Sequence, residues 1–330
     1  MIKIPNYTIT KKIASGGMGD VYLAKHTTLD KTVAIKSLHA NLVNNEDFRK
    51  RFITEAKTHY KLKHPNIVEL RDFQEQENGL FLIMEYVEGK QLNDYIKKET
   101  GPIPEDILIP LFTKILEAIE YAHSKKLIHR DIKPANILIT KEGGVKVIDF
   151  GIVKNDEEDS GLTKADQKVG TPSYMSPEQV NGDKIDKLSD IYSLGVTLYE
   201  MAVGKPPYEG LTSNFKIQTK IVNEPLPDPK KVYPGTSEKL IQIIEKATNK
   251  DKKKRYKSCK EFIKSFSKDA KPKPVVKEIP KKKATKTRKN IDTKTSQGIK
   301  TNPQSNKKKW ITVGILFLLI FLVVLFNYFF

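Results

Sequence analysis

The stretch that decides the fold is "IHRDIKPANIL", residues 128–138, in which charged side chains stand between apolar ends. Asp131, Lys133 and Asn136 lie at offsets of 0, +2 and +5. Phosphoryl transfer to a hydroxyl requires a carboxylate near that hydroxyl, a cation near the moving phosphate and an oxygen ligand for a metal ion. This one loop supplies all three, so the sequence indicates phosphoryl-transfer chemistry.

Further motifs flank this loop in a fixed order. "DFG" at 149–151 offers a second oxygen ligand, and "GTPSYMSPE" (170–178) and "SDIYSLGVTLYEM" (189–201) follow it. Upstream, "VAIK" places Lys36 on an alternating strand. A lone strand lysine is ordinarily a solvated residue, but the motifs downstream favour a functional role for Lys36.

The glycine-rich stretch "ASGGMGDV", residues 14–21, is close to G-x-G-x-x-G-x-V, with Ala14 in place of the first glycine. Alternating segments at 7–15, 20–27 and 31–38 predict that it joins strand to strand. A dinucleotide-binding fingerprint would need a helix after the glycines, and no Walker A pattern occurs in the chain. The stretch is therefore expected to be a hairpin loop whose N–H groups lie over phosphates.

The rest of the first 268 residues predicts a mixed α+β architecture. Apolar residues at Ile107, Leu111, Ile115, Ile119 and Ala122 or His123 predict a long amphipathic helix that begins after Pro104. "NILIT" and "GVKVIDF" flank a "KEGG" turn and predict a hairpin. Since the chain from about 185 is mostly helical in pattern, we expect a small strand-rich lobe followed by a larger helical lobe.

With these motifs in order, the sequence resembles the eukaryotic-type (Hanks-type) protein kinase family over about residues 7–267. Ser176, Pro177 and Glu178 stand where that family has its Ala-Pro-Glu motif. The overall plan is most similar to bacterial membrane-anchored Ser/Thr kinases. The resemblance implies a bilobal protein kinase fold with a β-rich N-lobe and a larger helical C-lobe.

The resemblance also implies ATP as donor with Mg²⁺ or Mn²⁺ as the metal. Lys36 would hold the α- and β-phosphates and pair with Glu55, while Met84 would be the gatekeeper beside the hinge. The implied nucleotide-binding residues are Ile13, Ala14, Ser15, Gly16, Gly17, Met18, Gly19, Asp20, Val21, Ala34, Lys36, Glu55, Met84, Glu85, Val87, Leu138 and Asp149. Val21, Ala34 and Leu138 are expected to sandwich the adenine, with backbone groups of Glu85 and Val87 bonding its edge.

For catalysis, the resemblance implies that Asp131 orients the acceptor hydroxyl and takes its proton, and that Lys133 stabilises the transferring charge. Asn136 and Asp149 would hold the metal ion. Lys133 in H-R-D-x-K and Thr171 in "GTPSY" are similar to Ser/Thr rather than Tyr kinases. Two alternatives are an inactive scaffold and a small-molecule kinase of the same fold. A scaffold would not require these catalytic groups, which are all present. A small-molecule kinase is disfavoured because "GTPSYMSPE" resembles the segment that holds a peptide acceptor.

Regulation is expected at the segment between Asp149 and Glu178. Arg130 would receive a phosphate there. The hydroxyl candidates are Ser160, Thr163, Thr171, Ser173, Tyr174 and Ser176, of which Thr163 is preferred. Phosphorylation in trans would involve a dimer. Glu178 is expected to form a structural ion pair with Arg255.

The C-terminal segments differ in composition from the predicted kinase domain, residues 1–268. Residues 269–309 hold 14 Lys and Arg against 3 Asp and Glu and few large apolar residues, so we expect a disordered linker. Its lysines are either solvated or attracted to anionic lipid headgroups, and nucleic acid fits least because no aromatic residues are interleaved.

Residues 310–330 are expected to form a transmembrane helix. The run 311–330 carries no charge over 20 residues, about 30 Å of helix, with Trp310 and Tyr328 near its borders. A buried core helix is the alternative. Lys307–Lys309 place the kinase domain in the cytoplasm by the positive-inside rule, which makes this a tail anchor. The single cysteine, Cys259, excludes a disulfide within the chain, and no signal peptide pattern begins it.

Overall fold

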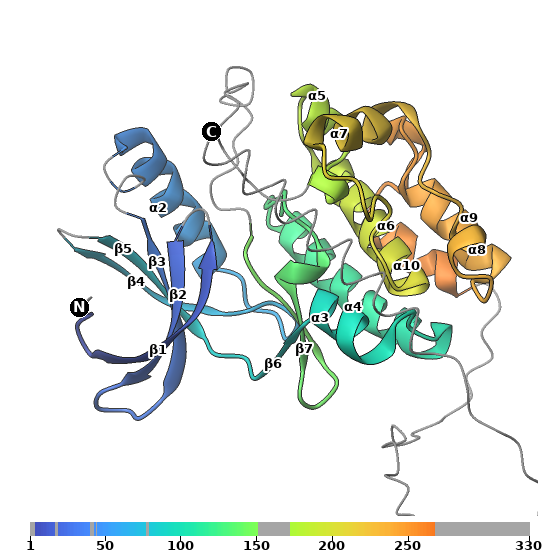
Figure 1. Cartoon of the computed structure of the whole chain (residues 1–330). Helices are drawn as coiled ribbons and strands as arrows, with labels where there is room; N and C mark the ends of the chain where they lie inside the picture. The colour runs from blue at the N-terminus through green and yellow to red at the C-terminus, as the bar shows by residue number, and fades with distance from the viewer. Residues whose placement is uncertain are drawn as a thin grey trace, which may run out of the picture. The chain divides into compact units, whose positions relative to one another are not determined.

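The computed structural model describes residues 4–16, 19–39, 43, 45–76, 79–150 and 172–267. The chain divides into two compact units, Met1–Pro272 and Lys273–Phe330, and the second lies wholly outside the described residues. In the first unit a strand-rich lobe precedes a larger helical lobe (Figure 1). The predicted α+β, two-lobed architecture is confirmed.

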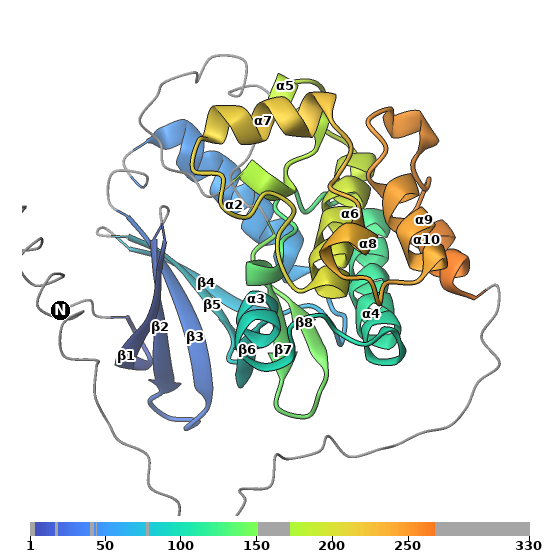
Figure 2. The same cartoon turned by 45° about the vertical axis from the view of Figure 1, so that its right-hand side comes forward.

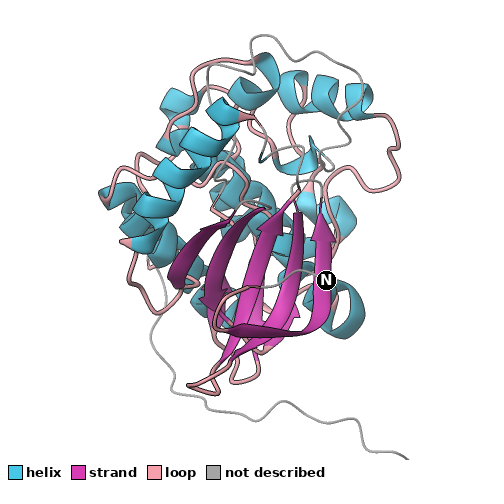
Figure 3. Cartoon of the chain, turned by 90° about the vertical axis from the view of Figure 1, so that its left-hand side faces the viewer, coloured by secondary structure: helices cyan, strands magenta, loops and turns pink. Residues whose placement is uncertain are grey.

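The small lobe is built on a five-stranded antiparallel sheet in the order β1-β2-β3-β5-β4 (Figure 3). Its strands are β1 Tyr7–Gly16, β2 Gly19–His26, β3 Thr32–Leu38, β4 Leu70–Gln76 and β5 Gly79–Glu85. The glycine-rich stretch joins β1 to β2, with Gly16 paired to Gly19, which confirms the predicted hairpin. Position 19 requires glycine, because a Cβ there would lie 2.0 Å from the carbonyl oxygen of Ser37 on β3.

The two faces of this sheet are covered differently. Because successive strand residues point to opposite faces, Val33 and Ile35 of β3 share one face, which is buried with Phe81 and Ile83 of β5. On the other face Leu38 packs against Phe52 of the helix α2, Glu46–Tyr60, which lies across the sheet (Figure 1). Lys36 shares this second face with Leu38 by the same alternation.

The link between the lobes follows the end of β5 at Glu85. A second, three-stranded antiparallel sheet begins with β6 Gly89–Gln91 and continues with β7 Ile137–Thr140 and β8 Val145–Val147 (Figure 2). The hairpin predicted around "KEGG" is thus confirmed. The strand β6 was missed, because its sequence "GKQ" carries no apolar alternation. Residues 86–88 join the two sheets where the sequence predicts a hinge.

The large lobe contains the described helices after β6 (Figures 1 and 2). They are α3 Leu92–Tyr95, a π-helical turn Ile96–Thr100, α4 Glu105–Ser124, α5 Pro177–Asn181, α6 Lys187–Val203, α7 Asn214–Asn223, α8 Pro229–Val232, α9 Glu238–Ala247 and α10 Cys259–Phe266, with 3₁₀ turns at Pro134–Asn136, Pro172–Tyr174 and Lys252–Lys254. Every residue of α6 from Ser189 to Val203 is buried, so this helix is the centre of the lobe.

The helix predicted after Pro104 is confirmed as α4, but its predicted first core residue is wrong. Ile107 is 43% exposed, whereas Leu108 is fully buried. Leu108, Leu111, Phe112 and Ile115 recur at three- and four-residue spacing, so the apolar face begins one residue later than predicted.

Within the part of the chain that the structure describes, no helix is both long and apolar enough to cross a bilayer. The predicted linker, residues 269–309, and the predicted span, residues 310–330, lie outside that part.

Candidate active site

The three predicted catalytic residues meet in the loop before β7. Lys133 Nζ donates to Asp131 Oδ2 at 2.7 Å, and Asn136 Nδ2 donates to the same oxygen at 2.9 Å. Asn136 Nδ2 also lies 2.8 Å from the backbone oxygen of Asp131. The side chains of Lys133 and Asp131 are 29% and 26% exposed, so a substrate hydroxyl can reach them.

The two predicted metal ligands lie next to each other because of the β7–β8 hairpin. Ile148, the residue before Asp149, donates its N–H to the backbone oxygen of Asn136 at 2.9 Å. Since the amide nitrogen of Asn136 faces Asp131, its side-chain oxygen is the atom that can serve as a ligand. One amide oxygen and one carboxylate are hard oxygen donors, and Mg²⁺ is commonly held by such a small set together with phosphate oxygens. The donor set therefore fits the implied metal.

Lys36 contacts Asp149 across the lobes. Its Nζ lies 2.6 Å from Asp149 Oδ1, and the side chain of Lys36 is only 17% exposed. Asp149 has a φ of 50°, a backbone conformation that is uncommon for residues other than glycine. The predicted partner Glu55 lies within α2, but its side chain is outside the described part. The contact of Lys36 with Asp149 is one that sequence reasoning missed.

Four of the predicted nucleotide-binding residues of the small lobe share one face of the sheet. Val21 is paired with Lys36 and Ala34 with Met84, and directly opposed residues point to the same face. All four are partly buried. Leu138, the other predicted adenine contact, lies on β7 of the second sheet.

The first predicted residues of the glycine-rich stretch lie on the edge strand β1. Ile13 is 41% exposed there, and Ala14 is paired with Val21. Gly17 and Met18 lie outside the described residues.

The predicted hinge carries its own polar contacts. The N–H of Glu85 donates to the backbone oxygen of Glu69 at 2.9 Å, so an adenine contact from Glu85 would have to use its carbonyl oxygen. The Glu85 carboxylate accepts the N–H of Glu69 at 3.2 Å and pairs with Lys146 of β8. Val87 is half-buried in the link that follows.

Two histidines pack against Phe150 of the "DFG" motif. The Phe150 ring centroid lies 4.6 Å from that of His129 and 5.4 Å from that of His59 on α2. His59 Nε2 donates to the backbone oxygen of Val68 at 3.0 Å. Burial lowers the pKa of His129 and lowers that of His59 to about 4, so both rings are neutral near pH 7.

Asp190 of α6 is a functional residue that sequence reasoning missed. It accepts from His123 Nε2 at 2.7 Å and from the backbone N–H groups of His129 at 2.8 Å and Arg130 at 2.9 Å. Burial alone would raise the pKa of Asp190, but the hydrogen bond from His123 and the neighbouring histidines hold that pKa below its usual value. The only sequence signal was the Asp of "SDIYSLG", which directly follows the capping-box residue Ser189 near the start of α6.

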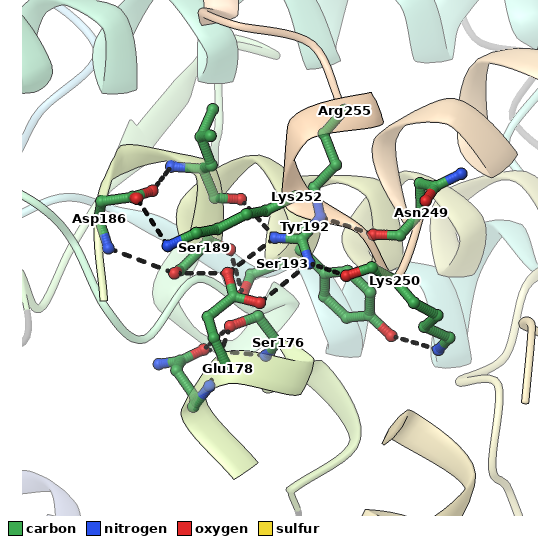
Figure 4. Close-up of polar contacts among 12 residues, drawn as sticks. Ser176, Glu178, Asp186, Ser189, Tyr192, Ser193, Asn249, Lys250, Lys252 and Arg255 are labelled. Atoms are coloured by element: carbon green, nitrogen blue, oxygen red, sulfur yellow. Dashed lines mark hydrogen bonds and ion pairs between the residues drawn. The ribbon is translucent and has the colours of Figure 1, made fainter. Parts of the chain in front are cut away.

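The predicted ion pair of Glu178 with Arg255 is confirmed and buried (Figure 4). Arg255 Nη1 donates to Glu178 Oε1 at 2.7 Å and Nη2 to Oε2 at 2.9 Å, a two-pronged geometry. Ser189 Oγ adds a donor to Oε1 at 2.7 Å. Burial would raise the pKa of Glu178, but Arg255 outweighs it and holds the pKa below its usual value.

Of the six predicted hydroxyl candidates, three lie in the described part, where Ser173 and Ser176 are buried and Tyr174 is partly buried. Ser173 is 3% exposed, and Ser176 is fully buried, where it caps α5 by accepting the N–H of Gln179. The Tyr174 hydroxyl donates to the carboxylate of Glu200 on α6. The other three, Ser160, Thr163 and Thr171, lie outside the described residues.

The comparisons with known proteins agree with this geometry. Residues 7–267 match the family model described as "Protein kinase domain". The chain is 40% identical over 257 residues to the probable serine/threonine-protein kinase CPE1738 of Clostridium perfringens, covering 78% of this chain and 37% of that protein. It is 35% identical to the serine/threonine-protein kinase PrkC of Bacillus subtilis, covering 96% of this chain and 51% of that one.

Solved structures resemble the chain as well. The crystal structure of the Mycobacterium tuberculosis PknI kinase domain matches with a TM-score of 0.64 and 26% identity, covering 80% of this chain and 96% of that one. The chain spans about half or less of the length of the curated relatives named above.

Proposed function

Because this chain belongs to the protein kinase domain family, we propose that it is a Ser/Thr protein kinase that transfers the γ-phosphate of ATP to serine and threonine hydroxyls of proteins. The observation that carries the proposal is the cluster around Asp131. Its carboxylate gathers Lys133 and Asn136 within hydrogen-bond distance, and the β7–β8 hairpin puts Asn136 beside Asp149.

Each group in this cluster has a distinct task. Asp131 orients the acceptor hydroxyl and takes its proton, while Lys133 lies where negative charge develops on the moving phosphate. Lys36 supplies a second cation at the phosphates from the small lobe. Asn136 and Asp149 would hold Mg²⁺, which supplies charge neutralisation at the phosphate oxygens when bound. Positioning and electrostatics therefore account for the chemistry, without a covalent intermediate.

The choice of serine and threonine as acceptors rests on two supports. Lys133 follows Asp131 by two residues, as in the Ser/Thr kinases that the sequence resembles. The named relatives are themselves described as serine/threonine-protein kinases. An inactive scaffold is disfavoured, because Lys36, Asp131, Asn136 and Asp149 are all retained.

Membrane tethering through residues 310–330 is part of the proposal. The alignment with PrkC covers 96% of this chain, so it extends well past residue 267. The uncharged run and the preceding Lys307–Lys309 fit a single span with the kinase domain in the cytoplasm. Deletion of 310–330 should move the protein from the membrane to the soluble fraction; sedimentation of the truncated chain with membranes would contradict the span.

Regulation by autophosphorylation at Thr163, in trans within a dimer, completes the proposal. Ser173 and Ser176 are buried, and the Tyr174 hydroxyl is hydrogen-bonded to Glu200. The remaining candidates for phosphorylation are Ser160, Thr163 and Thr171. Phosphopeptide mapping of the intact chain after incubation with ATP and Mg²⁺ should find phosphate at Thr163, and Thr163→Ala should lower activity. Phosphate found only elsewhere, with full activity in the variant, would reject Thr163.

The central test is phosphate transfer from radiolabelled ATP with Mg²⁺ to a generic basic protein. Asp131→Asn and Lys36→Met should each lower the rate by about 10²-fold or more, because each removes a group at the reacting atoms. Asp106→Asn, at an exposed carboxylate in the first turn of α4, is the matched control and should keep the wild-type rate. Phosphoamino acid analysis should yield phosphoserine and phosphothreonine. Undiminished labelling by either active-site variant would contradict the assignment of the chain as a Ser/Thr protein kinase.

A further inference from the structure

A carboxylate on the glycine-rich hairpin collects three donors. Asp20 Oδ1 lies 2.7 Å from Lys12 Nζ and accepts from Ser15 Oγ at 2.6 Å, while Asp20 Oδ2 accepts from the Tyr22 hydroxyl at 3.2 Å. Hydrogen bonds from Lys12 and then Ser15 lower the pKa of Asp20 to about 2, so the group is ionised throughout the working range of a protein. We call these four residues the Asp20 cluster.

The Asp20 cluster lies on the face of the sheet opposite to Val21, Ala34, Lys36 and Met84, although Ser15 and Asp20 are themselves among the predicted nucleotide contacts. Ser15 is paired with Asp20 and Lys12 with Tyr22, and directly opposed residues share a face. Val21 lies between Asp20 and Tyr22 in the strand, so it points to the other face, together with its partner Lys36. The cluster can therefore act on the nucleotide only through the backbone that it holds.

Besides its backbone pairing with β2, the end of β1 has no apolar packing within the described residues. Every residue of β1 from Thr10 to Gly16 is exposed, so apolar packing does not fix this part of the strand. The β1–β2 pairing also shifts register twice, between Ile9 and Lys11 and again between Lys12 and Ala14. The side-chain contacts of Asp20 with Lys12 and Ser15 span the second shift.

On the other side of the turn, β2 is tightly fixed. A Cβ on Gly19 would lie 2.0 Å from the carbonyl oxygen of Ser37, so the start of β2 packs directly on the β3 backbone. Asp20 is the next residue of β2, and its carboxylate contacts Ser15 and Lys12 of β1. These contacts link the end of β1 to the fixed start of β2. The cluster thus lies directly beside the pairing of Gly16 with Gly19.

We propose that Asp20 is a positioning residue for ATP: its carboxylate ties Lys12 and Ser15 of β1 to β2 and sets Gly16 opposite Gly19, where backbone N–H groups meet the phosphates. The inference rests on the proposed function, because ATP is taken as the donor. Without this tie, ATP must order the strand end on binding, which weakens its affinity. The chemical step is carried by the cluster around Asp131, so kcat changes little.

The test measures KM for ATP and kcat in the purified 330-residue chain. Asp20→Ala should raise KM for ATP about fivefold, as expected for one partly exposed polar network, and leave kcat within about twofold. Asp20→Asn loses the charge and keeps a single acceptor oxygen, for Ser15 or for Tyr22 but not for both. KM should therefore rise by less than in Asp20→Ala. Lys12→Met should add little to Asp20→Ala, because both changes break the same tie.

An ion pair at the turn between β2 and β3 offers a control. Lys25 Nζ lies 2.8 Å from Asp30 Oδ1 near the other end of β2, and Asp30 has a φ of 51° that asparagine tolerates. Asp30→Asn should leave KM and kcat at wild-type values. In the nucleotide-free chain, backbone N–H groups of residues 12–16 should exchange with solvent faster in Asp20→Ala than in Asp30→Asn.

Two failures can be told apart. A wild-type chain that bound no ATP with Mg²⁺ would overturn the proposed function itself. Normal ATP binding by wild type together with an unchanged KM in Asp20→Ala would overturn only the assignment of Asp20. A fall in kcat equal to the rise in KM would also overturn it, since Asp20 would then act on the chemical step.

Discussion

The carboxylate of Asp190, on the central helix α6, accepts the backbone N–H of His129 at 2.8 Å. Its other oxygen accepts the N–H of Arg130 at 2.9 Å, and Arg130 has a φ of 65°, a conformation that is strained for a bulky residue. A buried carboxylate thus holds the backbone that leads directly into Asp131. The catalytic loop takes its shape from a helix 60 residues further along the chain.

Asp190→Asn should therefore damage both stability and turnover. An amide has only one acceptor oxygen, so at least one of the bonds to His129, Arg130 and His123 is lost and a buried donor is left unsatisfied. We expect a loss of about 2–4 kcal/mol in the free energy of unfolding, and a kcat at least about tenfold lower. Asp186→Asn, at the N-cap of the same helix, is the control and should cost little, because asparagine caps as well as aspartate. Wild-type kcat in Asp190→Asn would contradict this role.

The buried pair of Glu178 and Arg255 predicts an asymmetric mutational response. Arg255→Ala should cost about 3–5 kcal/mol in urea unfolding, because it leaves the Glu178 carboxylate buried without its cation. Arg255→Lys should recover little of that loss, since an ammonium cannot donate to both carboxylate oxygens in the observed two-pronged geometry. The double variant Glu178→Gln with Arg255→Ala should be less destabilised than the sum of the single changes. Strict additivity would show that the pair does not act as a unit.

Local patterns were enough to predict β1, β2, β3, β7, β8 and α4. The strands flanking the glycines alternate in residue type, and α4 has apolar residues at helical spacing, so each element follows from its own segment. The ion pair of Glu178 with Arg255 could be predicted from the resemblance to the kinase family, in which Glu178 holds the position of the Ala-Pro-Glu glutamate. The error at Ile107 arose because Ile107 and Leu108 are neighbours in the sequence and both lie at helical spacing from Leu111, as i+4 and i+3. The spacing alone does not tell which of the two faces the core.

Contacts between segments that are distant in the sequence could not be predicted from local patterns. Lys36 and Asp149 are 113 residues apart, and nothing in either segment says that they touch. Asp190 has an ordinary place in the first turn of a helix, and its role depends on where the loop with His129 packs. Asp20 stands between two recognised residues of the glycine-rich motif, but two of its donors, Lys12 and Tyr22, lie outside that motif, and Ser15 holds one of its variable positions.

The neutral, buried His59 predicts that acid destabilises the kinase domain. Its pKa is lowered from 6.5 to about 4 by burial, so below pH 6.5 the unfolded chain binds a proton that the folded chain does not. Stability is therefore lost as pH falls from about 6.5 towards 4, by about 2 kcal/mol between pH 7 and 5 from this residue. His59→Gln, which cannot titrate, should lose that much less in urea unfolding over the same interval. An equal pH dependence in His59→Gln and wild type would contradict the assignment.

The two paired glycines of the β1–β2 turn should respond differently to alanine in the nucleotide-free protein. A Cβ on Gly19 would lie 2.0 Å from the backbone oxygen of Ser37, so β2 must move away from β3, whereas the nearest atom to a Cβ on Gly16 is 3.7 Å away, an ordinary contact. Gly19→Ala should therefore lower the free energy of unfolding by about 1–3 kcal/mol, while Gly16→Ala should be neutral or slightly stabilising, because alanine reduces the entropy of the unfolded chain. Urea unfolding of both variants without ATP measures the difference, and each variant serves as the control for the other. If Gly16→Ala were the more destabilised of the two, the close packing of β2 on the β3 backbone would not be what requires glycine at position 19.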